Sequence, residues 1–177
     1  MTRPTFTWPW LTAYAAIAVA TAVALGFVRI NTTPSMPPGI YLRLPLGAER
    51  PAAGDDVFAC MPPGPDARLA LERGYIPRGV WPCASGGVPL LKHVLAAEGE
   101  TVVVGPRGVY VGRRLAGPAP PSSDSLGRPL RPRVGEWRLG PGELWLGSDI
   151  VNGYDSRYLG PISSDLVLGR ARLLVRI

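Results

Sequence analysis

An uncharged apolar run constrains this chain more than any other feature. It extends from Trp10 to Val28, is rich in alanine, and is followed at once by Arg29. A helix of about 20 such residues is about 30 Å long, which matches the hydrocarbon core of a bilayer. We therefore expect residues 10–28 to form a transmembrane anchor between a cytoplasmic tail, residues 1–9, and a single domain, residues 29–177. The positive charges of Arg3 and the amino terminus outnumber the single charge of Arg29, which favours an amino terminus in the cytoplasm.

A cleaved secretory signal is the alternative interpretation of the same run, because it follows a positive charge at Arg3. Its apolar length, however, exceeds the roughly 7 to 15 residues that such signals use. No small-x-small site is followed by an acceptable mature start before Asn31. We therefore favour a retained anchor.

The rest of the chain is predicted to be mainly β. With 22 Gly and 21 Pro among 177 residues, many turns and short strands are expected rather than long helices. One short helix is predicted at residues 67–73, and a loop at residues 117–129. Alternating apolar runs predict strands over residues 39–44, 54–60, 88–97, 102–104, 108–115, 136–139, 143–146 and 166–175, with a hairpin within residues 102–115.

The charge of the chain excludes several functions. Its net charge is +6 and its pI is about 9.9, but the arginines are scattered and form no basic cluster with interleaved aromatic residues. We therefore expect no nucleic-acid partner. The single histidine, His93, and the lack of carboxylates at ligand spacing predict no metal and no other cofactor.

Lys92 is the only lysine among 19 lysines and arginines. In a strand with a period of two, Lys92 shares a face with Leu90 and Val94, whereas His93 points the other way. Apolar neighbours desolvate an amine and lower its pKa, and a lysine can lose its proton where an arginine cannot. Lys92 is thus a candidate general base. The plain alternative is a strand lysine whose head reaches water.

A proline-rich stretch presents one serine soon after the apolar run. Pro34, Pro37 and Pro38 flank Ser35 and keep it out of a regular helix, so its hydroxyl is expected on a stiff, extended segment. Ser35 lies at most about 20 Å of extended chain from Arg29. It is either a nucleophile beside the membrane or part of a linker, and the opposite direction of the only histidine argues against a Ser-His triad.

Two further pairs of residues are candidates for structural roles. Cys60 and Cys83 can form one disulfide outside the cytoplasm, which would close residues 60–83 into a loop that leaves the main fold; we call this segment the excursion. Two unpaired buried thiols are the alternative. Asp155 and Arg157 can form a local ion pair that fixes a loop, or belong to a solvated turn.

Taken together and in this order, four segments resemble the conserved boxes of the signal peptidase I superfamily. The form Pro-Ser-Met-Pro-x-Gly-x-Tyr of the first box, with the excursion between the cysteines, most resembles the TraF-like conjugative transfer peptidases. The segments are Ser35-Met36-Pro37-Pro38 for the nucleophile box, Gly54-Asp55-Asp56-Val57-Phe58 for the strand after it, Leu91-Lys92-His93-Val94 with Glu98-Gly99-Glu100 for the lysine box, and Asp155-Ser156-Arg157-Tyr158-Leu159-Gly160-Pro161 near the C-terminus.

The chain departs from the pattern of this family at three positions. His93 replaces the usual arginine and Glu100 the usual aspartate. Gly153 stands where the family commonly has a serine that helps to orient the lysine, so neither Ser148 nor Ser156 can be assumed to take over that role.

The resemblance implies a signal-peptidase-like β catalytic domain and a serine peptidase with a Ser-Lys dyad. Neutral Lys92 would accept the Ser35 proton, and Oγ would attack the scissile carbonyl to form an acyl-enzyme. The Ser35 amide and the Thr33 hydroxyl would hold the oxyanion. Asp155 with Arg157 would shape the floor of the site.

The resemblance also implies a place and a substrate. The enzyme would be a single-pass protein of the bacterial inner membrane with its catalytic domain in the periplasm. Its substrate would be an exported precursor, namely a pilin of a conjugative type IV secretion system, whose components are further candidate partners. An acyl-enzyme admits either water, which hydrolyses the product, or an amine, which cyclises it.

Two other functions remain as alternatives. The first is a general type I signal peptidase that acts on many secretory proteins. The second is a non-catalytic periplasmic assembly component in which Ser35 is only a linker residue. Self-cleaving repressors of the LexA type are disfavoured by the anchor and by the lack of a DNA-binding helix pair.

Overall fold

The computed structural model describes residues 10, 12–14, 16–17, 26–79 and 83–177. The predicted tail, residues 1–9, and most of the predicted anchor, residues 10–28, lie outside the described residues, so the anchor stays a prediction. Within the described part of the chain, the helices are all too short or too polar to cross a bilayer.

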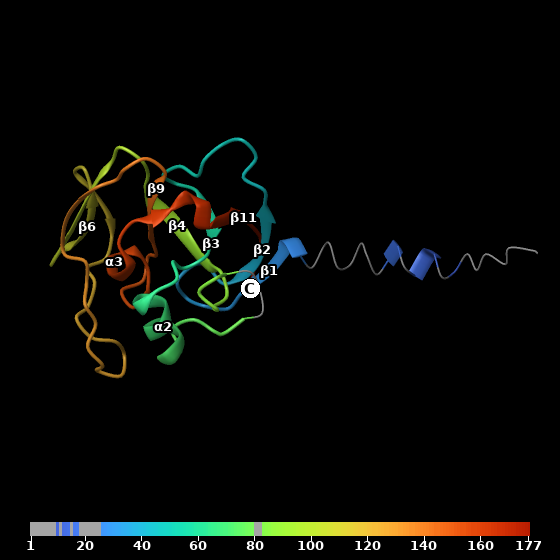
Figure 1. The fold of residues 1–177 in the computed structure, drawn as a ribbon, viewed down its shortest axis with the longest axis horizontal. Coiled ribbons are helices and arrows are strands. Elements are labelled where there is room, and N and C mark those ends of the chain that lie inside the picture. The colour runs from blue at the N-terminus through green and yellow to red at the C-terminus, as the bar shows by residue number, and fades with distance from the viewer. Residues whose placement is uncertain (1–9, 11, 15, 18–25, 80–82) are drawn as a thin grey trace, which may run out of the picture.

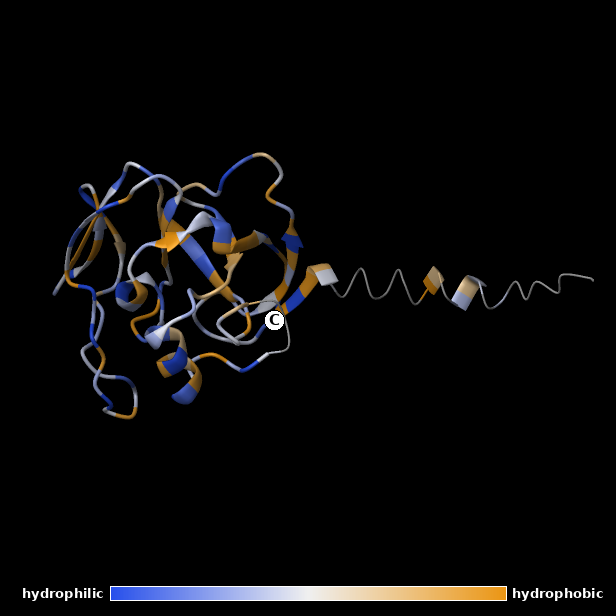
Figure 2. Ribbon diagram, viewed as in Figure 1, coloured by the Kyte–Doolittle hydropathy of each residue, from blue (hydrophilic) through white to orange (hydrophobic). Residues whose placement is uncertain are grey.

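Among the residues that the structure describes, seven strands form the larger of two antiparallel sheets, in the order β1-β2-β11-β3-β4-β9-β10 (Figure 1). The strands are β1 Val28–Asn31, β2 Gly39–Leu44, β3 Asp56–Ala59, β4 Leu90–Ala96, β9 Glu143–Gly147, β10 Ile162–Ser163 and β11 Val167–Arg176. Figure 2 shows that both hydrophobic and hydrophilic residues occur along the strands of this sheet. The C-terminal strand β11 pairs with both β2 and β3 and so joins the two ends of the domain.

A smaller sheet of four strands has the order β7-β6-β5-β8. Its strands are β5 Thr101–Gly105, β6 Gly108–Val111, β7 Arg114–Gly117 and β8 Gly135–Arg138. Gly112 makes the tight turn between β6 and β7 with a φ of 57°, a value that favours glycine. The inward valines of this sheet, such as Val102 and Val109, pack on the fully buried Trp145 of β9.

After β1, the described part of the chain contains three short helical segments: α2 Pro65–Glu72, α3 Ser156–Leu159 and the 3₁₀ turn η1 Ser164–Leu166. Ala67 and Ala70 of α2 pack with Ile76 and with Leu90 at the start of β4. The excursion therefore covers the end of the strand that carries Lys92.

The predicted mainly β class is confirmed, and the predicted strands occur in order with small changes at their ends. The hairpin predicted within residues 102–115 is confirmed, because β5 pairs with β6. The run 108–115 forms two strands, β6 and β7, because Gly112 turns the chain. The helix predicted at 67–73 is α2, which begins earlier at Pro65. Strands β1 and β10 were not predicted. Strand β1 begins at Val28, the last residue of the predicted anchor, and β10 has only two residues.

Cys60 and Cys83 form a disulfide with their Cα atoms 5.3 Å apart, so the alternative of two free thiols is wrong. Cys60 follows β3, and Cys83 precedes β4. Because β3 and β4 are neighbours in the larger sheet, the disulfide closes the excursion, residues 60–83, at its base.

Replacing both cysteines, Cys60→Ser with Cys83→Ser, should lower the free energy of unfolding by about 3 kcal/mol, because the crosslink closes a loop of moderate length in the unfolded chain. Urea denaturation of the full chain measures this change. Reductant should destabilise the wild-type protein by a similar amount and leave the double variant unchanged. Equal stability of the two proteins without reductant would contradict the prediction.

Candidate active site

Lys92 lies in the middle of β4 and is only 4% exposed. Burial removes water from the ammonium group and lowers the pKa of Lys92; nearby Asp155 raises this pKa and Arg157 lowers it. The net direction is downward, so the neutral amine is favoured. The alternative of a lysine reaching out to water therefore does not apply here.

His93 points away from Lys92, as the period of the strand predicts. Its Nδ1 contacts Asp56 of the neighbouring strand, and its Nε2 lies 3.5 Å from Asp149. The hydrogen bond to Asp56 is the main reason that the pKa of His93 is raised. His93 lines a separate cavity that contains neither Ser35 nor Lys92. Within the described residues, no group of three His, Cys, Asp or Glu side chains is placed to hold a metal.

Ser35 lies in a turn between β1 and β2, not on the extended segment that we predicted. The buried Asn31 explains the turn, because its Nδ2 donates hydrogen bonds to the carbonyls of Thr33, Met36 and Pro37 at 3.0, 3.0 and 3.2 Å. Met36, next to Ser35, is 2% exposed and packs among the apolar residues of the larger sheet. Sequence reasoning missed Asn31, although asparagine is a known turn former.

Thr33 is held close to Ser35 by the same turn. Its hydroxyl donates a hydrogen bond to Asn31 Oδ1 at 2.7 Å. Thr33 Oγ1 also lies 3.2 Å from Ser35 Oγ, and since its own proton is used, Ser35 is the donor in this pair. The Ser35 N–H has no acceptor in the described part of the chain.

Asp155 and Arg157 form a buried ion pair with exposures of 0% and 1%, so the alternative of a solvated turn is wrong. Arg157 Nε and Nη2 donate to the two carboxylate oxygens of Asp155, each at 2.8 Å. Nη2 also donates to the carbonyls of Ile150 and Gly153 at 2.9 and 3.0 Å. One guanidinium group therefore fixes the whole loop that precedes α3.

Ser148 completes this network and explains the glycine at position 153. Ser148 Oγ, in a residue that is 2% exposed, donates to Asp155 Oδ2 at 2.9 Å. A Cβ atom added to Gly153 would lie 2.0 Å from Ser148 Oγ and 2.8 Å from Arg157 Nη2. Ser148 thus fills the space that a serine at position 153 would need.

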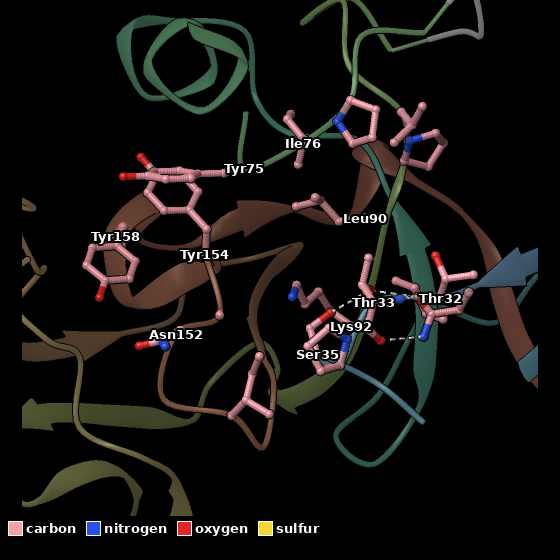
Figure 3. A pocket seen from close by; sticks show the side chains of 18 of the residues that line it. Thr32, Thr33, Ser35, Tyr75, Ile76, Leu90, Lys92, Asn152, Tyr154 and Tyr158 are labelled. Atoms are coloured by element: carbon pink, nitrogen blue, oxygen red, sulfur yellow. Dashed lines mark hydrogen bonds between the residues drawn. The ribbon is translucent and has the colours of Figure 1, made fainter. Parts of the chain in front are cut away.

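A single cavity of about 1030 Å³ contains both candidate catalytic side chains. Figure 3 shows Ser35 and Lys92 close to each other with Thr33 beside them, although no hydrogen bond joins Ser35 to Lys92 in the described structure. Asp155 and Arg157 do not line the cavity; they lie behind Gly153, which does. The disulfide is also outside the lining, but the excursion that it closes contributes Tyr75 and Ile76.

This arrangement suits acyl transfer. A serine hydroxyl and a buried amine with a lowered pKa face one cavity, which is the combination that activates a nucleophile. The free N–H of Ser35 can stabilise an oxyanion. The cavity is large enough for a peptide.

The variant Gly153→Ser should lower the free energy of unfolding by about 1 to 3 kcal/mol, because the new Cβ overlaps Ser148 Oγ in a packed interior. Thermal unfolding of the full chain measures the loss. In a Ser148→Ala background the same substitution should cost less, because the overlapping oxygen is gone. If Gly153→Ser costs as much in both backgrounds, Ser148 is not what excludes the side chain.

Comparison with known proteins agrees with the geometry. The chain matches the family model described as "Signal peptidase, peptidase S26" over residues 5–176. It is 36% identical over 165 residues to the conjugal transfer protein TraF of Agrobacterium fabrum, with 89% of each chain covered. It is 38% identical over 160 residues to the probable conjugal transfer protein TraF of Sinorhizobium fredii, covering 89% of this chain and 82% of the relative.

A plasmid transfer protein TraF of Escherichia coli is 38% identical over 152 residues, with 84% of this chain and 83% of the relative covered. The resemblance inferred from the four sequence segments is therefore confirmed over most of the chain. The chain belongs to the signal peptidase family, peptidase S26.

Proposed function

We propose that this protein is a membrane-anchored serine endopeptidase in which Ser35 is the nucleophile and Lys92 the general base. One observation carries the proposal: the only serine of the proline-rich turn and a buried lysine with a lowered pKa line the same cavity. Membership of the signal peptidase family supports a peptidase function. The dyad is our assignment of roles to these residues.

The chemical steps follow from the two groups. Neutral Lys92 accepts the Ser35 proton while Ser35 Oγ attacks the scissile carbonyl. The resulting ammonium group then gives the proton to the leaving amine, and the peptide bond breaks to leave an ester on Ser35. The hydroxyl must first turn from Thr33 to Lys92, a change that substrate binding can drive, since such contacts tighten in the enzyme–substrate complex.

The oxyanion would be bound by the free N–H of Ser35. Thr33 was expected to add a hydroxyl, but its proton is donated to Asn31 Oδ1 in this structure. Thr33 can contribute to oxyanion binding only if that hydrogen bond is exchanged for one to the substrate. In this structure Thr33 Oγ1 instead accepts a hydrogen bond from the Ser35 hydroxyl, at 3.2 Å.

The proposed substrate is an exported precursor, in particular a pilin precursor of a conjugative type IV secretion system. Relatives with the names "Conjugal transfer protein TraF" and "Plasmid transfer protein TraF" support a role in conjugation. We place the anchor, residues 10–28, in the bacterial inner membrane and the domain from residue 29 onward in the periplasm. Water would release a shortened pilin, and an amine at the other end of the precursor would close a ring.

Ser35→Ala and Lys92→Arg should each abolish processing of a pilin precursor co-expressed from the same locus, because one removes the nucleophile and the other leaves a group that keeps its proton. Mass spectrometry of the precursor measures the outcome, and a mass difference of one water distinguishes hydrolysis from ring closure. His93→Gln, on the opposite face of the strand, should retain processing.

Processing by both dyad variants at the wild-type rate would make Ser35 a linker residue and favour an assembly component. Processing of many unrelated exported proteins by the wild type would instead favour a general signal peptidase.

The pH dependence of kcat/KM should follow Lys92. The neutral amine is the active form, so activity rises with pH through the Lys92 pKa and then levels off. Because burial lowers this pKa, the plateau is reached at a lower pH than for an exposed lysine. Cleavage rates from pH 5 to 10 test this; activity that stays flat down to pH 5 would contradict the role of Lys92.

A further inference from the structure

Three tyrosines line the end of the cavity that lies away from Ser35 and Lys92 (Figure 3). The rings of Tyr154 and Tyr158 are stacked, with centroids 5.1 Å apart and planes at 6°. Tyr75 lies against Tyr154 at 5.0 Å and 44°. Such packing makes a broad apolar wall whose side chains support one another.

The wall is held in place by contacts outside the dyad. Tyr75 donates its hydroxyl proton to Asp124, and Arg128 Nε donates to the same carboxylate at 2.6 Å. Tyr158 donates to the carbonyl of Pro121 at 3.0 Å. These bonds tie the loop between β7 and β8 to the excursion and to α3, so the far end of the cavity is built before a substrate arrives.

Tyr154 differs from the two other tyrosines, because its hydroxyl has no hydrogen-bond partner in the described part of the chain. Its ring is half-buried, and burial raises the pKa of Tyr154. Asn152 also lines the cavity, and its exposed side chain makes no hydrogen bond to a described residue. Both groups can therefore bond to a peptide that passes along the wall.

The size of the cavity indicates a ligand of several residues. A volume of about 1030 Å³ lies at the upper end of the range for pockets that enclose small ligands, about 300 to 1,000 Å³. The dyad requires only that the scissile carbonyl and the adjacent residues of the peptide lie within its reach, so the rest of the cavity can hold other residues of the peptide. Ile76 and Leu90 line the same cavity, so an apolar surface accompanies the tyrosine wall.

We infer that Tyr75, Tyr154 and Tyr158 form a second substrate subsite, which takes one bulky apolar or aromatic side chain of the peptide several residues from the scissile bond. This inference rests on the proposed peptidase function. The subsite favours an uncharged side chain, because Asp124, the carboxylate at its rim, is already engaged by Tyr75 and Arg128. The guanidinium groups nearby are engaged as well, Arg73 by the Tyr75 hydroxyl and the Pro129 carbonyl and Arg128 by Asp124. A charged side chain would therefore lose water there without gaining a free partner.

Binding of labelled peptides to the full-length Ser35→Ala protein tests the subsite without cleavage. The probes are twelve-residue fluorescent peptides with an Ala-x-Ala core, the small-residue pattern of secretory cleavage sites. Ala, Phe or Asp is moved through the positions on either side of the core. Phe at one remote position should bind about tenfold more tightly than Ala, as expected for burial of one aromatic side chain, whereas Asp should give no gain.

Two variants of the Ser35→Ala protein should remove the preference for Phe. Tyr154→Ala opens the wall, and Tyr110→Ala, a half-buried tyrosine of the smaller sheet, is its matched control. Asn152→Trp fills the subsite from an exposed position, so it keeps the test valid if Tyr154→Ala fails to fold. Val151→Trp, at the exposed neighbour that does not line the cavity, is its control.

Equal binding of the Phe and Ala peptides at every position, absence of binding, or a preference that survives Asn152→Trp would overturn the subsite. Cleavage of the same peptides by the wild-type chain is measured in parallel. Binding with a Phe preference but no cleavage would count against the dyad and leave the subsite standing. Cleavage without any preference for Phe would support the dyad and overturn the subsite.

Discussion

The buried ion pair between Asp155 and Arg157 is the interaction on which the site depends. A lone buried carboxylate near Lys92 would stabilise the ammonium form and keep the lysine protonated. Here the guanidinium group offsets that field, since Asp155 raises the pKa of Lys92 and Arg157 lowers it. Desolvation then decides the direction, and the amine can be neutral. The same guanidinium group holds the loop that carries Gly153 against the cavity. The ion pair therefore positions the loop that lines the cavity, and it limits how far the Asp155 carboxylate can raise the pKa of Lys92.

The order of the strands explains how Ser35 and Lys92 come together. Ser35 lies in the turn between β1 and β2, whereas Lys92 lies on β4, and the sheet order places β11 and β3 between them. Strand β11 is the last strand of the chain. Its pairing with β2 and β3 brings the two halves of the site into one sheet. The dyad geometry is thus a product of long-range pairing, which forms only when the C-terminal residues have joined the sheet.

Much of the fold could be predicted because it is local. A period of two identified most strands and the face of Lys92, and the disulfide and the ion pair followed from residue types at suitable positions. The parts that were missed depend on three-dimensional contacts that residue type and periodicity do not specify, even where the partners are near in sequence. The sequence of β1 does not indicate that it pairs with β2. The hydrogen bonds of Asn31 form only when the turn around Ser35 is closed, so residue type alone does not predict them. Likewise, Ser148 fills the space beside Gly153 only because Arg157 folds the intervening loop back on itself.

The two ends of the cavity are built from different kinds of structure, and this division separates chemistry from selectivity. Lys92 lies on a central strand, and Ser35 is fixed by Asn31 and by the buried Met36, so the reactive groups are rigid. Tyr75 lies on the stapled excursion, and its partner Asp124 on the loop between β7 and β8. Connections of this kind tolerate changes in sequence and length better than the strands of a sheet do. Substrate preference can therefore change in the excursion and the loop without disturbing the dyad, because the sheet that holds Ser35 and Lys92 does not depend on either segment for its strand pairing.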